Sequence, residues 1–134
     1  MTDSHLLRTT LAVNSLATAV SGVVFTLGAA PLASLFGLPG PLPLAAFGVA
    51  LLGFALYVWR VRREPIDLVQ ARAVFFMDVA YVIASVGLIV VWPRLLSPLG
   101  RIGVGLMADV VAVFAVLEFV GLRRARRATA TAAA

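Results

Sequence analysis

The chain has 134 residues, of which 62% are hydrophobic and 13% are charged, and its formal net charge is +5. Soluble domains are about 45 to 50% apolar and about 25% charged, so this composition excludes an ordinary water-soluble domain. A mean hydropathy of +1.05 points in the same direction. We therefore expect lipid to surround most of the protein, as one membrane domain over residues 1–127.

The first half of the chain predicts two membrane spans. Residues 9–59 contain no Asp, Glu, Lys, Arg or His, and only a Pro- and Gly-rich stretch at 31–43 interrupts them. One helical crossing needs roughly 20 apolar residues, so we expect helices near 7–30 and 42–62. A cleaved signal peptide is the alternative for the first span. Its apolar stretch is longer than the usual core of about 7 to 15 residues, which favours a permanent span.

The connection at 31–43 reads PLASLFGLPGPLP and carries no charge. Its leucines and phenylalanine indicate a short interfacial or re-entrant segment in the outer headgroup layer. Such a segment is either a lipid-anchored turn or a lid over a ligand cavity, and the composition favours the turn.

The second half repeats the pattern with acids inserted. Residues 73–92 are apolar apart from Asp78, and residues 104–122 are apolar apart from Asp109 and Glu118. Backbone groups inside a bilayer must be satisfied internally, and these runs lack the alternation of barrel strands. The sequence therefore predicts two further helices.

We place these helices near 69–92 and 101–124, with residues 128–134 as a disordered Ala/Thr tail. The predicted fold class is all-α, a four-helix transmembrane bundle. Aligning Asn14 with Asp78 also aligns Ser21 with Ser85, which suggests a parallel repeat of two hairpins. Two unrelated membrane hairpins would match as well, so the duplication stays open.

Arginine supplies every basic side chain, since the chain contains no Lys. In a four-span topology nine arginines fall on one side of the membrane: Arg8, Arg60, Arg62, Arg63, Arg72, Arg123, Arg124, Arg126 and Arg127. Only Arg94 and Arg101 fall on the other side. The positive-inside bias predicts that both termini are cytoplasmic, in a multi-pass protein of the bacterial cytoplasmic (inner) membrane.

Seven of these arginines form a predicted cytoplasmic anchor. They lie in the last turn of the second and fourth spans or directly after them: Arg60, Arg62, Arg63, Arg123, Arg124, Arg126 and Arg127. A basic run beside a membrane helix fixes topology and contacts anionic lipid, so we expect the lipid bilayer, and no nucleic acid, as its partner.

Several kinds of chemistry are excluded by composition. The chain has no Cys and a single His, His5, which precedes the first span. Disulfides, thiolate metal sites and paired haem histidines therefore have no residues to form them, and a Ser/His/Asp triad would need a His near the reacting centre, whereas His5 precedes the first span. We expect no metal, no cofactor and no enzymatic activity.

The candidate site consists of polar residues inside the membrane. At 1.5 Å per residue, Asn14 and Asp78 lie roughly 10 to 14 Å from the cytoplasmic edge and Glu118 lies about 6 to 9 Å from it. These three residues share a layer, with Asp78 as the strongest candidate and Asn14 as its neutral partner. Glu118 could instead snorkel to the interface or pair with Arg72.

Asp109 lies about 20 Å from the same edge. Nine residues at about 100° each place it opposite Glu118, so one of these two acids must face away from any shared site. A carboxylate in mid-membrane costs about 2.5 to 3.5 kcal/mol, which is why such groups usually pair or face the bundle interior. Asp78 is then either a structural tie between helices or a functional site.

The layout as a whole resembles a known group. Four short spans, a first helix with Ser21 and Gly22, an uncharged Pro/Gly first connection and an Arg-rich second connection are similar to the small, uncharacterised four-helix integral membrane proteins of bacteria, broadly the DoxX-like group. The resemblance implies a link to quinone-dependent redox complexes.

Three functions follow as expectations. The first is a non-catalytic accessory or assembly subunit, with a second copy or a membrane complex as partner. The second is a small-solute or proton-linked carrier that uses Asp78. The third is a quinone- or lipid-binding subunit associated with redox proteins, which would use a groove between helices.

Overall fold

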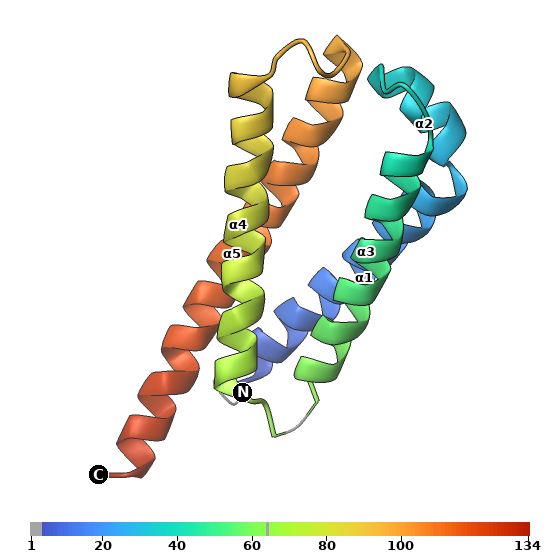
Figure 1. The fold of residues 1–134 in the computed structure, drawn as a ribbon. Helices are drawn as coiled ribbons and strands as arrows, with labels where there is room; N and C mark the ends of the chain where they lie inside the picture. The colour runs from blue at the N-terminus through green and yellow to red at the C-terminus, as the bar shows by residue number, and fades with distance from the viewer. Residues whose placement is uncertain (1–3, 64) are drawn as a thin grey trace.

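The computed structural model describes residues 4–63 and 65–134, and this part of the chain contains helices and no strand (Figure 1). The helices are α1 (Ser4–Leu27), α2 (Ala29–Phe36), α3 (Leu42–Val61), α4 (Leu68–Val91) and α5 (Pro98–Ala132). Four of them, α1, α3, α4 and α5, are long and apolar enough to cross a membrane. The predicted all-α class with four spans is confirmed.

The first helix ends earlier than predicted. Gly28 takes φ −91° and ψ 15°, which turns the chain out of α1 before α2 begins. A Cβ at this position would lie 2.7 Å from the carbonyl oxygen of Val24, so glycine allows the bend. The predicted span to residue 30 is therefore split, and the short segment expected in the first connection is the helix α2.

The last helix is longer than predicted at both ends. It begins at Pro98, because the Ser97 Oγ accepts a hydrogen bond of 3.0 Å from the N–H of Gly100 and caps the helix. It continues to Ala132, whereas we expected disorder over residues 128–134. The continuation has two causes. Alanine has the lowest free-energy cost of adopting a helical conformation of any residue, and the Thr129 hydroxyl donates a hydrogen bond to the carbonyl oxygen of Ala125.

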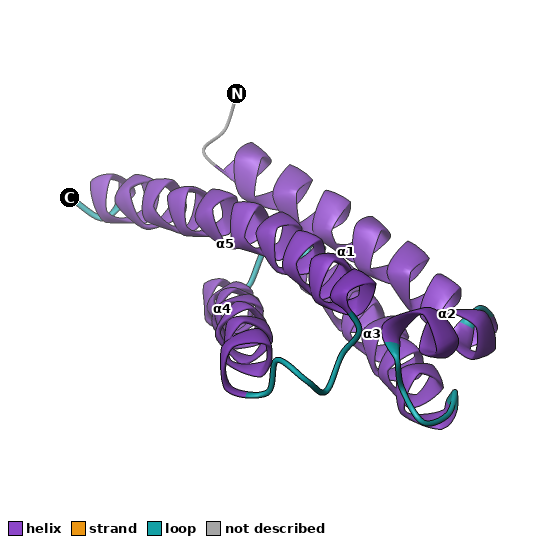
Figure 2. Ribbon diagram, turned by 90° about the horizontal axis from the view of Figure 1, so that it is seen from above, coloured by secondary structure: helices purple, strands orange, loops and turns teal. Residues whose placement is uncertain are grey.

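The four long helices form two hairpins. α1 packs most extensively along α3, and α4 packs along α5 (Figures 1 and 2). The hairpins meet mainly where α1 lies against α5, while α3 and α4 contact each other very little. The bundle is therefore closed on its α1–α5 side and loosely packed on its α3–α4 side.

Glycines bring α1 and α3 close together. A Cβ on Gly48 would lie 2.6 Å from the backbone nitrogen of Thr26, and one on Gly22 would lie 2.9 Å from the carbonyl oxygen of Gly48. Nearby, the Ser15 hydroxyl donates a hydrogen bond of 2.7 Å to the carbonyl oxygen of Ala55. Small residues and interhelical hydrogen bonds are the usual means of helix association in lipid, so this hairpin is built as a unit.

We define the basic end of the bundle as the end at which α1 and α4 begin and α3 terminates. It is the lower end in Figure 1, where the arginine-rich part of α5 also lies. One buried core joins all four long helices there: Leu7, Leu11, Val58, Val61, Ala71, Val74, Leu122 and Ala125. Gly121 allows α5 to approach α1, since a Cβ at Gly121 would lie 3.1 Å from the Cα of Leu7.

We call the opposite end the far end. Its hydrophobic core cluster of buried residues consists of Ala29, Ala33 and Leu44, from α2 and α3. α2 is tied to the start of α5 through Ser97, whose Oγ donates to the carbonyl of Leu35 at 2.6 Å. The Ser97 N–H also donates to the carbonyl of Phe36 at 2.9 Å. The far end thus lacks a core shared by all four long helices.

Candidate polar site and groove

Three side chains from three helices meet inside the bundle. The Asn14 Nδ2 on α1 donates one hydrogen bond of 2.7 Å to Asp78 Oδ2 on α4 and another of 2.8 Å to Glu118 Oε1 on α5. Asn14 is 1% exposed, Asp78 is 3% exposed and Glu118 is fully buried. The structure therefore brings together the three residues that sequence depth placed in one layer, and we call them the polar trio.

Asn14 is suited to this position because its amide has two N–H groups, one for each acid. Its Oδ1 in turn accepts a hydrogen bond of 3.1 Å from the Thr18 hydroxyl on the next turn of α1. Within the described residues, the backbones of α1 and α4 do not pack directly against each other. The Asn14 amide is therefore a polar link between α1 and α4, in addition to the apolar core that they share at the basic end.

The two acids lie close together. Each has an oxygen bonded to the same Asn14 nitrogen, so these two oxygens cannot be farther apart than the sum of the two hydrogen-bond lengths. The second oxygen of Glu118, Oε2, is buried and accepts no hydrogen bond from the described residues. A buried carboxyl oxygen without a donor is costly.

The two other fates predicted for Glu118 do not occur. Its side chain is fully buried, so it does not snorkel to the interface. Arg72 is exposed, and its guanidinium lies 5.4 Å from the centre of the Phe76 ring instead of pairing with Glu118. Glu118 belongs to the interior of the bundle.

Asp109 lies outside the trio. It is exposed on α5, among the exposed side chains of Leu106, Val110 and Val113. This agrees with the prediction from helical geometry that Asp109 and Glu118 point in opposite directions.

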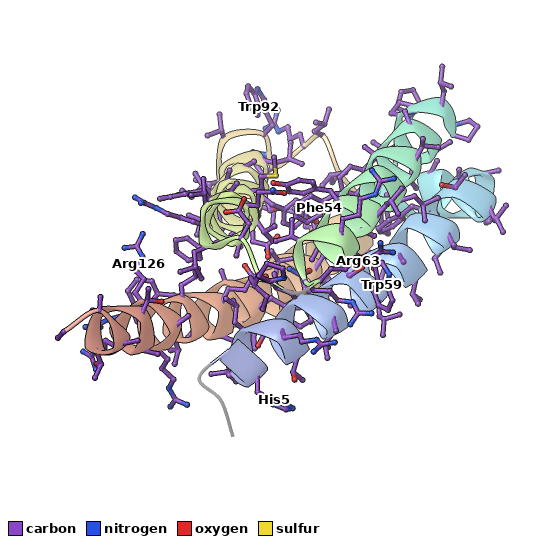
Figure 3. The ribbon with its side chains drawn as sticks, turned by 90° about the horizontal axis from the view of Figure 1, so that it is seen from below. His5, Phe54, Trp59, Arg63, Trp92 and Arg126 are labelled. Carbon is purple, nitrogen blue, oxygen red and sulfur yellow. The ribbon has the colours of Figure 1, made fainter. Side chains whose placement is uncertain are left out.

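The seven anchor arginines lie at the basic end, and six of them are exposed, Arg62 being half-buried. Two fold over aromatic rings: the Arg62 guanidinium lies 3.4 Å from the ring centre of Trp59, and that of Arg123 lies 5.6 Å from the ring centre of Phe119. In Figure 3, Arg126 projects from the side of α5 and Arg63 lies beside Trp59 near the end of α3. Contact of these side chains with a headgroup layer stays a prediction.

A groove runs beside the polar trio, between the two hairpins. Its first part is a cavity of about 300 Å³ with Asp78, Thr18 and Ser21 in its wall, and the second part is a cavity of about 340 Å³ toward the far end. Tyr81 and Met107 line both cavities, so the two are neighbours. Phe54, which also lines the first cavity, points toward the middle of the bundle in Figure 3.

Aromatic rings line the groove and cross it. Phe47 on α3 stacks on Tyr81 on α4 with a centre-to-centre distance of 6.2 Å and an angle of 16° between the ring planes. Phe25 contacts Phe47 at 5.7 Å and Phe36 at 6.5 Å, which extends the row to α2. Sequence reasoning missed this row, because the rings are far apart in the chain and no motif connects them.

The described residues contain no group of three His, Cys, Asp or Glu side chains that could hold a metal ion. The site offers two carboxyl groups, an amide, a few hydroxyls and an apolar groove. Such a set binds protons, hydrogen-bonding groups and apolar bodies.

Comparison with known proteins adds no identification. The chain matches no protein-family model, no curated protein and no solved structure. The resemblance to the DoxX-like group stays a prediction from the layout of the spans.

Proposed function

We propose that this multi-pass membrane protein is a ligand-binding accessory subunit that holds a lipid-soluble molecule in the groove between its two hairpins. The observation that carries the proposal is the pair of adjoining cavities beside the polar trio. Ligand sites are typically concave, mostly apolar and about 300 to 1,000 Å³ in volume, with a few polar groups that fix orientation. The groove has each of these properties.

The lining of the groove indicates the class of ligand. Hydroxyls of Thr18, Ser21 and Tyr81 and the carboxyl of Asp78 supply polar contacts in the first cavity. Phe25, Phe36 and Phe47 line the second cavity, where they suit a flat ring or an acyl chain. A quinone or a lipid, with a polar head near Asp78 and an apolar body toward the far end, fits this division.

The orientation and the membrane are part of the proposal. Nine arginines occur at one end of the bundle and two at the other. The positive-inside bias supports cytoplasmic termini, and the layout of the spans supports the bacterial inner membrane. The predicted likeness to the DoxX-like group favours a quinone among the lipid-soluble ligands.

Native mass spectrometry of the protein released from nanodiscs tests the groove. We expect the wild-type protein to retain a small molecule of defined mass. Ala50→Phe and Ala84→Phe each add a ring in one of the cavities and should remove it. Ala80→Phe is the matched control, since Ala80 is exposed on α4 and lines neither cavity.

The same experiment identifies the contradicting result. If all four proteins carry only the lipids of the surrounding bilayer, in equal amounts, the groove is not a ligand site. Identification of the retained mass separates a quinone from an acyl lipid.

A second candidate is a proton-linked carrier. It is favoured by the polar trio, in which two acids face each other near the groove and Glu118 Oε2 has no donor among the described residues. Buried acids of this kind commonly form proton relays in transporters. In proteoliposomes Asp78→Asn should abolish pH-driven flux while the protein still folds, and unchanged flux would rule the carrier out.

A further inference from the structure

Asp109 lies on the surface of the bundle at the middle of the membrane. It follows the start of α5 by 11 residues and precedes Arg123 by 14 residues, which at 1.5 Å per residue is about 16 Å and about 21 Å. The hydrocarbon layer is about 30 Å thick, so a short Asp side chain at this depth does not reach either headgroup layer. An acid in this place is costly to leave in contact with lipid tails.

The residues around Asp109 form a packing face. Ile102, Leu106, Asp109, Val113 and Val116 are all exposed and follow one another at alternating spacings of four and three residues. This is the spacing of the seam by which one helix packs along another, and a single polar residue in such a seam selects the partner. We call these five residues the outer face of α5.

We propose that the outer face of α5 docks a transmembrane helix of another membrane protein, and that this helix carries an Arg or Lys opposite Asp109. The apolar side chains supply the packing, and the ion pair removes the cost of the acid in lipid. The inference does not depend on the groove being occupied. It gives the accessory-subunit expectation a specific contact surface.

A second copy of this chain fits the outer face of α5 less well than a helix that carries a cation. Copies inserted in the same orientation place their arginines at the same depths, and no basic residue lies between Arg101 and Arg123, between Arg72 and Arg94, or within residues 9–59. A second copy would therefore bring no cation to the level of Asp109. On the same face it would bring another Asp109, which adds like charge.

Designed host helices in liposomes test the proposal. One host peptide is a Leu/Ala transmembrane helix with Arg at its centre, and its control has Leu there. The chain has no Cys, so Ala133→Cys provides one site for a fluorescent donor outside the spans. We expect the Arg host to associate with the wild-type protein about tenfold more tightly than the Leu host, and Asp109→Leu to abolish this preference.

A second variant, in which the acid is moved along the helix, separates a loss of binding from an effect on folding. Asp109→Leu combined with Val116→Asp moves the acid two turns toward the basic end along the same face. The preferred host should then be one with its Arg two turns closer to that end. Equal binding of Arg and Leu hosts would overturn the proposal, as would self-association of the wild-type protein that Asp109→Leu eliminates.

Discussion

The two ends of the bundle differ in charge and are packed differently. At the basic end, side chains from all four long helices share one core, whereas at the far end the buried core belongs to α2 and α3 and a groove remains between the hairpins. Small residues such as Ala71, Ala125 and Gly121 allow the helices to converge at the basic end. Small residues therefore accompany the shared core at the basic end, whereas Gly22 and Gly48 bring α1 and α3 together without closing the groove.

The polar trio lies between these two regions, so removing its central donor should have the largest effect. Asn14→Leu deprives Asp78 and Glu118 of the hydrogen bonds that join α4 and α5 to α1. We expect the free energy of unfolding to fall by about 3 kcal/mol, because two buried acids lose their donor. An SDS titration followed by circular dichroism measures this change.

Thr18→Val is a milder substitution in the same hydrogen-bond network. It removes only the hydrogen bond from the Thr18 hydroxyl to Asn14 Oδ1 and keeps a side chain of similar size. We expect a loss of about 1 kcal/mol. If Asn14→Leu were as stable as the wild-type protein, the trio would not hold the hairpins together.

The same substitution at each end of α4 tests the comparison directly. Ala71 is fully buried in the core of the basic end, and Ala71→Phe should cost about 1 to 3 kcal/mol by overpacking. Ala84 is exposed and lines the groove, so Ala84→Phe should change stability by less than about 0.5 kcal/mol. Thermal unfolding in mild detergent compares the two, and similar losses would show that the groove is as tightly packed as the core.

The smallest predicted effect is at the first turn of α4. Asp67 caps this helix. Hydrogen bonds to its carboxylate lower the pKa of Asp67 below its ordinary value of 3.8; the largest contribution comes from the Gln70 side chain, and smaller ones come from the backbone N–H groups of Val69 and Gln70. A lowered pKa in the folded protein means that the cap stabilises α4 above pH 3.8. This contribution is lost as the pH falls through the lower, folded value.

Asp67→Asn is the control for that titration, because Asn is an equally good N-cap and has no charge to lose. The difference in unfolding midpoint between the two proteins should be nearly constant at neutral pH and should change only below about pH 4. A difference that changes between pH 5 and 8 would contradict the lowered pKa of Asp67.

The sequence predicted the features that depend on distance along one helix. Run length gave the four spans, depth placed Asn14, Asp78 and Glu118 in one layer, and a rotation of about 100° per residue separated Asp109 from Glu118. Each of these requires only that a helix forms.

Features that depend on how helices cross were not predictable. The break at Gly28, the sharing of one Asn14 nitrogen by two acids and the Phe47–Tyr81 stack each require the positions of two or more elements. A single sequence contains no measure of those positions. The continuation of α5 to Ala132 was predictable from the helix propensity of alanine, but low complexity was given more weight.

The contacts of Ser97 bear on how the proposed ligand would reach the groove. They fasten α2 to the start of α5 at the rim of the far end, and the shared core holds the helices together at the opposite rim. With both ends held, the proposed ligand would have to enter laterally between α3 and α4, where the two helices have few contacts and the Phe47–Tyr81 stack crosses between them. The proposed ligand would then enter from within a bilayer leaflet. Its partitioning into the bilayer, more than its concentration in water, would therefore set how much of it reaches the groove.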